Sequence, residues 1–363
     1  MISLYARNLA CGVLFATLAL SACGSDKKYE PPQSSEADAL FARFTTGTQP
    51  GVAVAVVLDG KLVHSGNYGF ADIESAAPIN AETAFRLASV SKQFAAMAIM
   101  MLEEQGSLSY DDPVGRYVPE LAVYPGVTIR QLLLHTGGLP DYYDRMDTSA
   151  GMPTNRDAAK LLAEIAQADF PPGAKYEYSN AGYDMLGPVV AAASGVSFRE
   201  FVEQRIFAKI GMTNSRVHDD TLPEIPNRAI GYEPDGAGFK LNDYDPLNAI
   251  IGSGGIYSTI NDLIKWDRAL YGEVLVREET LQLAFTSGTD NGGEPLDYGF
   301  GWRVEKFGEH KYLRHGGSWV GFRTHIARIP DLRFTIVMLS NRADVEPEEY
   351  VDALTALYLG EPD

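Results

Sequence analysis

The stretch FRLASVSK, residues 85–92, opens the first long helical pattern of the chain, which runs from Ser89 to Gln105. Ser89 and Lys92 are three residues apart, so on a helix they share one face with about 5 to 6 Å between their Cβ atoms. A lysine that loses its charge through burial or a cationic neighbour can take the proton of a serine hydroxyl. An apolar stripe follows on the same helix, made of Phe94, Ala98 and Met101. The stretch therefore predicts a nucleophile and its base.

The spacing Ser-x-x-Lys is loose by itself. Ser25 and Lys28 also fit it, but they lie in a polar stretch without any apolar stripe. Only Ser89 and Lys92 have the buried surroundings that a neutral lysine needs.

Strand patterns lie at both ends of the chain, and helical patterns lie between them. The N-terminal pattern, residues 51–69, has an apolar run and an alternating run on either side of Asp59-Gly60, which is typical of a β-hairpin. Four strand patterns follow Tyr298, at residues 299–308, 311–317, 322–329 and 334–341. Helical spacing occurs at residues 36–44, 156–168, 181–193, 197–209, 259–270 and 347–359.

This order predicts an α+β fold in which one mainly antiparallel sheet is built from both termini and is flanked by helices. We expect one domain over residues 36–360, with the sheet formed by about residues 50–70 and 298–341. A mostly helical subdomain over about residues 105–290 would be inserted into it. The active site would then lie between the sheet and the insertion.

The N-terminus has the pattern of a secretion signal. An apolar run from Leu9 to Leu20 is too short to span a bilayer, which needs about 20 residues, and it ends in small residues. Leu20-Ser21-Ala22-Cys23 resembles the lipobox of bacterial lipoproteins, which predicts a signal peptide over residues 1–22 and a lipid on Cys23. Residues 23–35 are polar and read as a tether. Gly24 after the cysteine favours the outer membrane, so we expect an exported protein anchored in the bacterial envelope and facing the periplasm.

Composition restricts the partners. The chain has 363 residues and a formal net charge of −18, without a basic stripe, which argues against nucleic-acid binding. The two cysteines are Cys11, inside the signal, and Cys23, so the body holds no thiol and no disulfide. The six histidines show no metal-binding spacing, and no nucleotide-binding loop or Gly-x-Ser-x-Gly elbow is present. We therefore expect no metal and no cofactor.

Two further motifs are candidates for the site. Tyr178-Ser179-Asn180 precedes a helical pattern, and a tyrosine beside a lysine can transfer protons while an amide donates to a substrate carbonyl. Taken alone, the triplet fits a helix cap beside a core tyrosine equally well. His315-Gly316-Gly317-Ser318 lies in a strand pattern, where glycines often mark the close approach of a ligand. A simple turn would explain this motif as well.

In this order, the three motifs resemble those of the serine β-lactamase and penicillin-binding-protein superfamily, in particular its class C β-lactamase-like branch. Five further stretches carry the same resemblance, at residues 50–72, 132–142, 252–266, 298–302 and 315–322, so that it covers residues 40–359. It implies a β-lactamase/transpeptidase-like fold and a covalent acyl-enzyme.

The resemblance also implies the roles of the site residues. Ser89 would attack a carbonyl with Lys92 as its base, and Tyr178 would relay protons and assist the attack of water. Asn180 would orient the substrate carbonyl. The backbone N–H groups of Ser89 and Ser318 would hold the oxyanion, and His315, Gly316 and Gly317 would contact substrate.

The chain departs from class C β-lactamases at one motif. Those enzymes carry Lys-Thr-Gly where this chain has His315-Gly316-Gly317. Histidine is mostly neutral near pH 7 and glycine has no hydroxyl, which argues against strong recognition of a β-lactam carboxylate. We therefore expect hydrolysis of a peptide, amide or ester. Peptidoglycan fragments are among the candidate substrates. A slowly acylated sensor lipoprotein and a true class C β-lactamase stay open as alternatives.

Two nearby residues are not expected to be catalytic. His135 follows helix-like sequence and fits a capping or packing role. Ser91 is adjacent to Lys92 and would point about 100° away from it on a helix.

Overall fold

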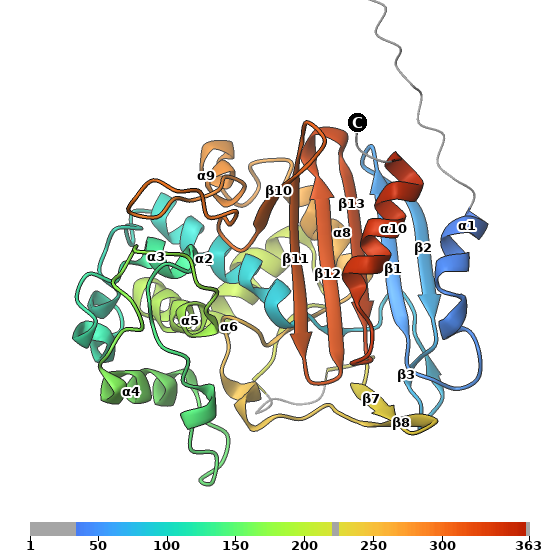
Figure 1. Cartoon of the computed structure of the whole chain (residues 1–363), viewed down its shortest axis with the longest axis horizontal. Coiled ribbons are helices and arrows are strands. Elements are labelled where there is room, and N and C mark those ends of the chain that lie inside the picture. Colours follow the sequence, from blue (N-terminus) through green and yellow to red (C-terminus); the bar gives the residue numbers. More distant parts are fainter. Residues whose placement is uncertain (1–33, 220–224, 361–363) are drawn as a thin grey trace, which may run out of the picture. The chain divides into compact units, whose positions relative to one another are not determined.

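The centre of the molecule is a six-stranded antiparallel sheet with the strand order β10-β11-β12-β13-β1-β2 (Figure 1). It is seen in a computed structural model that describes residues 34–219 and 225–360. The strands are β1 (Val52–Leu58), β2 (Lys61–Tyr68), β10 (Arg303–Phe307), β11 (His310–Trp319), β12 (Phe322–Ile329) and β13 (Phe334–Ser340). The N- and C-terminal strands meet where β1 pairs with β13, with Val52 opposite Ser340. The predicted α+β fold with a sheet built from both ends is therefore confirmed.

The β1–β2 hairpin turns at the predicted dipeptide. Asp59 and Gly60 both have positive φ angles, 51° and 70°. Such a turn matches the twist of the two strands, and glycine adopts this conformation without strain. The predictions for residues 1–33, including the signal peptide and Cys23, lie outside the described residues.

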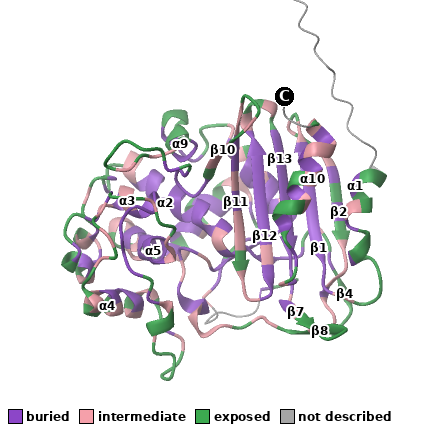
Figure 2. Cartoon of the chain, viewed as in Figure 1, coloured by how far each residue is buried: buried purple, intermediate pink, exposed green. Residues whose placement is uncertain are grey.

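The sheet is covered on both faces, which explains the continuous apolar run of β1. Val52, Val54 and Val56 belong to a cluster with the helices α1 (Ser34–Leu40) and α10 (Pro347–Leu359). The alternate residues Ala53, Ala55 and Val57 belong to the larger cluster that contains α2 (Lys92–Glu104) and α8 (Ile260–Ala269). Figure 2 shows the central strands buried between these layers. A strand with two buried faces loses the polar alternation of a strand with one wet face.

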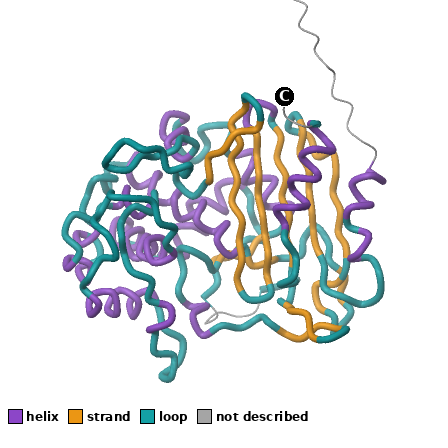
Figure 3. Tube along the Cα trace, in the orientation of Figure 1, coloured by secondary structure: helices purple, strands orange, loops and turns teal. Residues whose placement is uncertain are grey.

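The helical part lies beside the sheet and contains most of the loops (Figure 3). Its helices are α3 (Ile129–Leu133), α4 (Asn155–Ile165), α5 (Asn180–Ser194), α6 (Phe198–Phe201), α7 (Ala208–Ile210) and α9 (Glu278–Ala284). The remaining strands are short: β3 (Phe70–Asp72), β4 (Ala77–Pro78), β5 (Phe85–Arg86), β6 (Arg216–Val217), β7 (Tyr232–Asp235), β8 (Gly238–Leu241) and β9 (Ile256–Ser258). The helix expected over residues 197–209 is instead split by a π-helical turn, η6 (Val202–Phe207).

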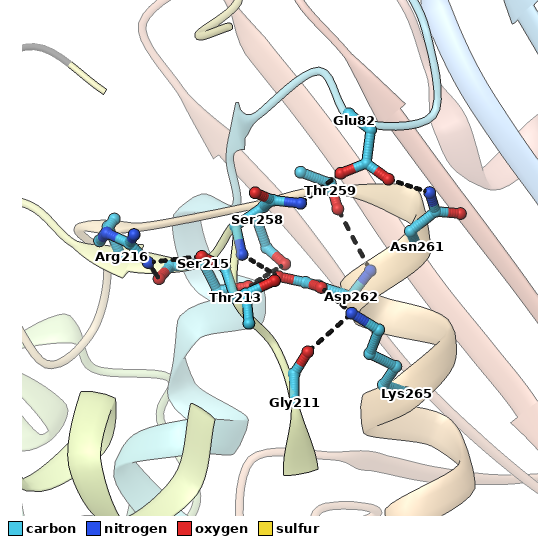
Figure 4. A network of polar contacts seen from close by, with 11 residues as sticks. Glu82, Gly211, Thr213, Ser215, Arg216, Ser258, Thr259, Asn261, Asp262 and Lys265 are labelled. Atoms are coloured by element: carbon cyan, nitrogen blue, oxygen red, sulfur yellow. Dashed lines mark hydrogen bonds and ion pairs between the residues drawn. The ribbon is translucent and has the colours of Figure 1, made fainter. Parts of the chain in front are cut away.

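A small sheet with the order β5-β9-β6 fixes the strand that leads to Ser89. Figure 4 shows the polar network behind it. The fully buried carboxylate of Asp262 accepts hydrogen bonds from Ser215 Oγ (2.9 Å), Asn214 N (2.8 Å) and Lys265 Nζ (2.8 Å). Ser215 Oγ also lies 2.8 Å from the hydroxyl of Ser258 in β9. The network therefore holds β9, and through it β5, against the start of α8.

Within residues 34–219 and 225–360, none of the helices has the length and hydrophobicity needed to cross a bilayer.

Candidate active site

Ser89 lies in the 3-10 turn η2 (Ala88–Ser91), between β5 and α2, and not in the α-helix itself. Lys92 is the first residue of α2. In a 3-10 turn, side chains three residues apart lie directly above one another, so the turn aligns Ser89 with Lys92 more closely than an α-helix would. Ala88, immediately before the nucleophile, has a φ of 48°, a left-handed conformation that an L-residue adopts at a cost of about 1 to 3 kcal/mol. Strained backbone of this kind clusters at functional sites.

Lys92 has a fully buried side chain that contacts three acceptors. Its Nζ lies 3.2 Å from Ser89 Oγ, 2.8 Å from Asn180 Oδ1 and 3.2 Å from the carbonyl oxygen of Ser253. An ammonium has three hydrogens to donate, so these contacts satisfy the protonated form completely. The predicted contact between Ser89 and Lys92 is present, and Asn180 joins it from the start of α5.

Tyr178 contacts Lys92 with its aromatic ring. Lys92 Nζ lies 4.8 Å from the centre of the Tyr178 ring, and the side chain is partly exposed. Among the described residues, no hydrogen bond joins the Tyr178 hydroxyl to Ser89 or Lys92. The structure therefore brings Ser89, Lys92 and Asn180 together by hydrogen bonds, and Tyr178 by a cation–π contact.

His135 contacts the segment that carries Tyr178. Its Nδ1 accepts a hydrogen bond from the backbone N–H of Ser179 (3.0 Å), and its ring lies 4.4 Å from that of Tyr178. Burial is the first cause that holds the pKa of His135 well below its usual value, followed by the charge of Lys92. A neutral imidazole can accept this hydrogen bond, whereas an imidazolium cannot. His135 therefore packs beneath the site and orients Tyr178.

The His315-Gly316-Gly317 motif lies on β11, as predicted. His315 is buried, with Nδ1 2.7 Å from the carbonyl oxygen of Gly316 and Nε2 2.9 Å from the hydroxyl of Tyr298. A carbonyl only accepts, so Nδ1 carries the proton and Nε2 accepts from the tyrosine. Burial, with a smaller contribution from Lys92, lowers the pKa of His315 to about 3. His315 therefore presents a neutral ring with both nitrogens already bonded.

Gly317 brings β11 close to the turn that carries Ser89. A Cβ at this position would collide with the carbonyl of Leu87 and the hydroxyl of Thr324. Thr324 Oγ1 in turn donates to the same Leu87 carbonyl at 2.7 Å. Only a residue without a side chain permits this approach, so the glycine places β11, and Ser318 with it, next to Ser89.

Two cavities meet at Ser89. The larger has a volume of about 520 Å³, and its lining includes every predicted residue of the hydrolytic site except Lys92. The smaller has a volume of about 40 Å³ and is lined by Arg86, Tyr143, Asn180, Ser253, Ser318 and Trp319, among others. Tyr178 lines the large cavity and not the small one.

Asp184 and Ser253 are part of the site but were not singled out from the sequence, although Ser253 lies in the stretch 252–266 that carries the resemblance. The buried Asp184 carboxylate lies 2.7 Å from the hydroxyl of Tyr142, 3.1 Å from that of Tyr143 and 3.3 Å from the backbone nitrogen of Ser253. Burial raises the pKa of Asp184, and these hydrogen bonds and the charge of Lys92 oppose the rise. Asp184 therefore holds the Ser253 segment whose carbonyl accepts from Lys92.

No group of three or more metal-ligating side chains that could hold an ion occurs in the described part of the chain.

We expect stability to fall steeply as the pH drops, because buried histidines stay neutral in the fold. The pKa values of His315 and His325 are each lowered to about 3, first by burial, while the unfolded chain binds a proton near pH 6.5. Their stabilising contribution is present above pH 6.5 and is lost as the pH falls toward 3. Lowering the pH from 7 to 5 should reduce the unfolding free energy by about 2 kcal/mol for each of the two histidines. Urea unfolding at several pH values measures the slope.

The variant His325→Gln tests the cause. Between pH 7 and pH 5, unfolding of this variant should take up about one proton fewer than unfolding of the parent protein. The slope of its unfolding free energy against pH should be smaller accordingly, whatever its stability at pH 7. A slope equal to that of the parent protein would show that His325 does not contribute.

Comparison with known proteins identifies the family. A family model described as Beta-lactamase matches residues 37–360. A penicillin-binding protein of Bacillus subtilis (strain 168) is 36% identical over 312 residues, which are 81% of this chain and 68% of that protein. A D-aminopeptidase of Gluconobacter oxydans (strain 621H) is 27% identical over 350 residues, which are 88% of this chain. The chain spans only 64% of the length of that enzyme.

Solved structures show the same fold. The penicillin-binding protein from Bacillus halodurans superposes with a TM-score of 0.77 at 30% identity, covering 91% of this chain and 100% of that one. The octameric penicillin-binding-protein homologue from Pyrococcus abyssi gives a TM-score of 0.80 at 26% identity, covering 91% of this chain and 78% of that one.

Proposed function

Because the chain belongs to the β-lactamase family of serine hydrolases, we propose that it hydrolyses a peptide or other amide, or an ester, through an acyl-enzyme on Ser89. One observation carries this proposal. Lys92 Nζ lies 3.2 Å from Ser89 Oγ inside a buried cluster, and Ser89 itself opens into two cavities. A nucleophile beside its proton acceptor, with room for substrate on both sides, is the arrangement that covalent hydrolysis needs.

Lys92 and Tyr178 act as one acid–base pair in this proposal. Lys92 Nζ lies 3.2 Å from Ser89 Oγ and 4.8 Å from the centre of the Tyr178 ring. In the form of the pair that reacts, the amine or the phenol provides the lone pair that accepts the Ser89 proton. Attack on the carbonyl transfers the Ser89 proton to the pair, and the pair returns it to the leaving group. Water then repeats the sequence to cleave the acyl-enzyme.

The leaving group occupies the large cavity, because Tyr178 lines that cavity and not the small one. Three arginines border the same cavity. Arg314 is paired with Glu305 and Glu348, and Arg323 donates to backbone carbonyls. Arg303 is exposed and has no ion pair among the described residues, so it is the cation available for a substrate carboxylate.

β-Lactam hydrolysis fits the site less well than peptide or ester hydrolysis. With a pKa of about 3, His315 carries no charge at pH 7, and both of its nitrogens are bonded within the protein. It therefore cannot supply the fixed positive charge that the lysine of class C β-lactamases provides. The D-aminopeptidase relatives support amide hydrolysis.

The proposal also includes export and lipid attachment at Cys23, on the strength of the apolar run and Leu20-Ser21-Ala22-Cys23. Such an anchor would place the hydrolase in the bacterial envelope, where peptidoglycan-derived peptides are available as substrates.

Labelling with a fluorophosphonate, followed by peptide mass analysis, tests the proposal. We expect the modification on Ser89, and turnover of at least one compound in a panel of D-alanyl peptides, nitrophenyl esters and nitrocefin. Labelling of Ser89 without any turnover would favour a sensor, and rapid turnover of nitrocefin alone would favour a β-lactamase. Labelling of a different serine would overturn the mechanism.

A further inference from the structure

Arg86 is a buried cation that the proposed mechanism leaves without a role. The residue is 3% exposed. Within the described part of the chain, its side chain makes one hydrogen bond, a long contact of 3.5 Å from Nη1 to the hydroxyl of Tyr257. The guanidinium carbon lies 5.6 Å from the centre of the Tyr257 ring. Nε has no hydrogen-bond partner among the residues that the structure describes. A guanidinium has five N–H donors, so most of its hydrogen-bonding capacity is unused.

The other buried arginines of the described chain each contact a carboxylate. Arg328 lies 3.1 Å from Asp267, and Arg342 lies 2.7 Å from Asp344. Among residues 34–219 and 225–360, no carboxylate forms an ion pair with Arg86. A buried charge without a partner destabilises a fold. A ligand carboxylate would supply the missing negative charge.

The place where a ligand could meet Arg86 is the small cavity beside Ser89. Arg86 and Ser89 both line it, together with Tyr143, Ser253 and Trp319. One water-sized group needs about 10 to 15 Å³, so a volume of about 40 Å³ holds about three such groups. A carboxylate has three heavy atoms, and it pairs with a guanidinium through two parallel hydrogen bonds.

The small cavity lies on the acyl side of the substrate, an assignment that rests on the proposed function. The group that protonates the leaving group is Tyr178, which lines the large cavity and not the small one. The part of the substrate that stays bound to Ser89 must then occupy the small one.

We infer that Arg86 forms an acyl-side subsite for a carboxylate, so that the preferred acyl group carries a negative charge a few bonds from the scissile carbonyl. The same cation repels a positively charged group. A free ammonium on the acyl residue, as an aminopeptidase substrate carries, is therefore disfavoured.

Two boronic acids of matched shape test this inference. Ser89 Oγ adds to boron to give a tetrahedral adduct, its proton passes to the Lys92–Tyr178 pair, and no group leaves. 2-Carboxyethylboronic acid carries the carboxylate, and 3-methylbutylboronic acid replaces its two oxygens with methyl groups. Protection of Ser89 from fluorophosphonate labelling measures the affinity of each compound. We expect the carboxylate compound to protect at a concentration at least about tenfold lower, as one charge-assisted contact predicts.

Three variants identify the cation. Arg86→Met should reverse the preference, and Arg86→Lys should keep part of it. Arg303→Met, in the large cavity, is the matched control and should keep the preference of the parent protein. The rate of labelling without boronic acid reports whether each variant is folded, and Arg86→Lys retains the charge if Arg86→Met does not fold.

The outcomes separate the inference from the proposed function. Equal protection by both compounds, no protection by either, or a preference that depends on Arg303 and not on Arg86, would overturn the subsite. Absence of Ser89 labelling in the parent protein would instead overturn the hydrolase mechanism.

Discussion

Ser89→Ala is expected to lower kcat/KM on the best substrate by about 10⁴-fold or more and to abolish fluorophosphonate labelling. The hydroxyl is the atom that becomes covalently bound, and no neighbouring group can replace it. The residual rate would come from substrate binding and from the backbone donors near Ser318. Steady-state kinetics on the parent and the variant, purified in parallel, measure the effect.

Ser91→Ala is the matched control for this experiment. The hydroxyl of Ser91 is buried and accepts from the backbone nitrogen of Ile256 at 3.3 Å, so it faces the small β5-β9-β6 sheet and not a cavity. We expect kcat/KM to stay within about tenfold, with a stability loss of about 1 kcal/mol from the hydrogen bond. Retention of activity in Ser89→Ala, or equal losses in both variants, would contradict the assignment of the nucleophile.

Lys92→Met is expected to lower kcat by about 10³-fold or more, with a smaller change in KM. The amine is half of the pair that receives and returns the serine proton, and general acid–base groups contribute about 10² to 10⁴-fold. Methionine has a similar length and suits a fully buried position. It leaves Asn180 Oδ1 and the Ser253 carbonyl without their donor, which costs stability in addition to rate. Kinetics and thermal unfolding on the same preparations separate the two effects.

Lys265→Met serves as the control lysine. Its Nζ bonds to Asp262 and to the Gly211 carbonyl in the network of Figure 4, away from Ser89. The variant should lose stability but keep kcat within a few fold. If Lys92→Met were no slower than Lys265→Met, a base at Lys92 would be untenable.

The sequence predicts local features of this protein well. The hairpin turn at Asp59-Gly60, the helix over residues 347–359 and the strand that carries His315 all follow from periodicity and turn residues. The contact of Ser89 with Lys92 follows from their spacing. These features depend on neighbours within one or two turns of the chain.

Features that depend on distant neighbours were not predictable in this way. Asp184 meets Ser253 across 69 positions, and Arg86 meets Tyr257 across 171. The short strands β4 to β6 have only two residues each, too few for any periodic pattern. The π-helical turn at residues 202–207 also could not be predicted, because the apolar spacing of residues 197–209 is the same for a regular helix and for one with a single wider turn.

The union of both chain ends in one sheet has a consequence for biosynthesis. Gly51, immediately before β1, accepts a hydrogen bond from Ser340, 289 positions later. While the polypeptide is being synthesised, the valine-rich β1 has only β2 as a neighbouring strand. Its other edge has no partner until β13 is translated, near the end of the chain. Open edges of apolar strands recruit other chains, and pairings of long sequence separation form slowly. The edge of β1 thus stays exposed to aggregation until β13, the last strand, appears, which is when a chaperone would matter most.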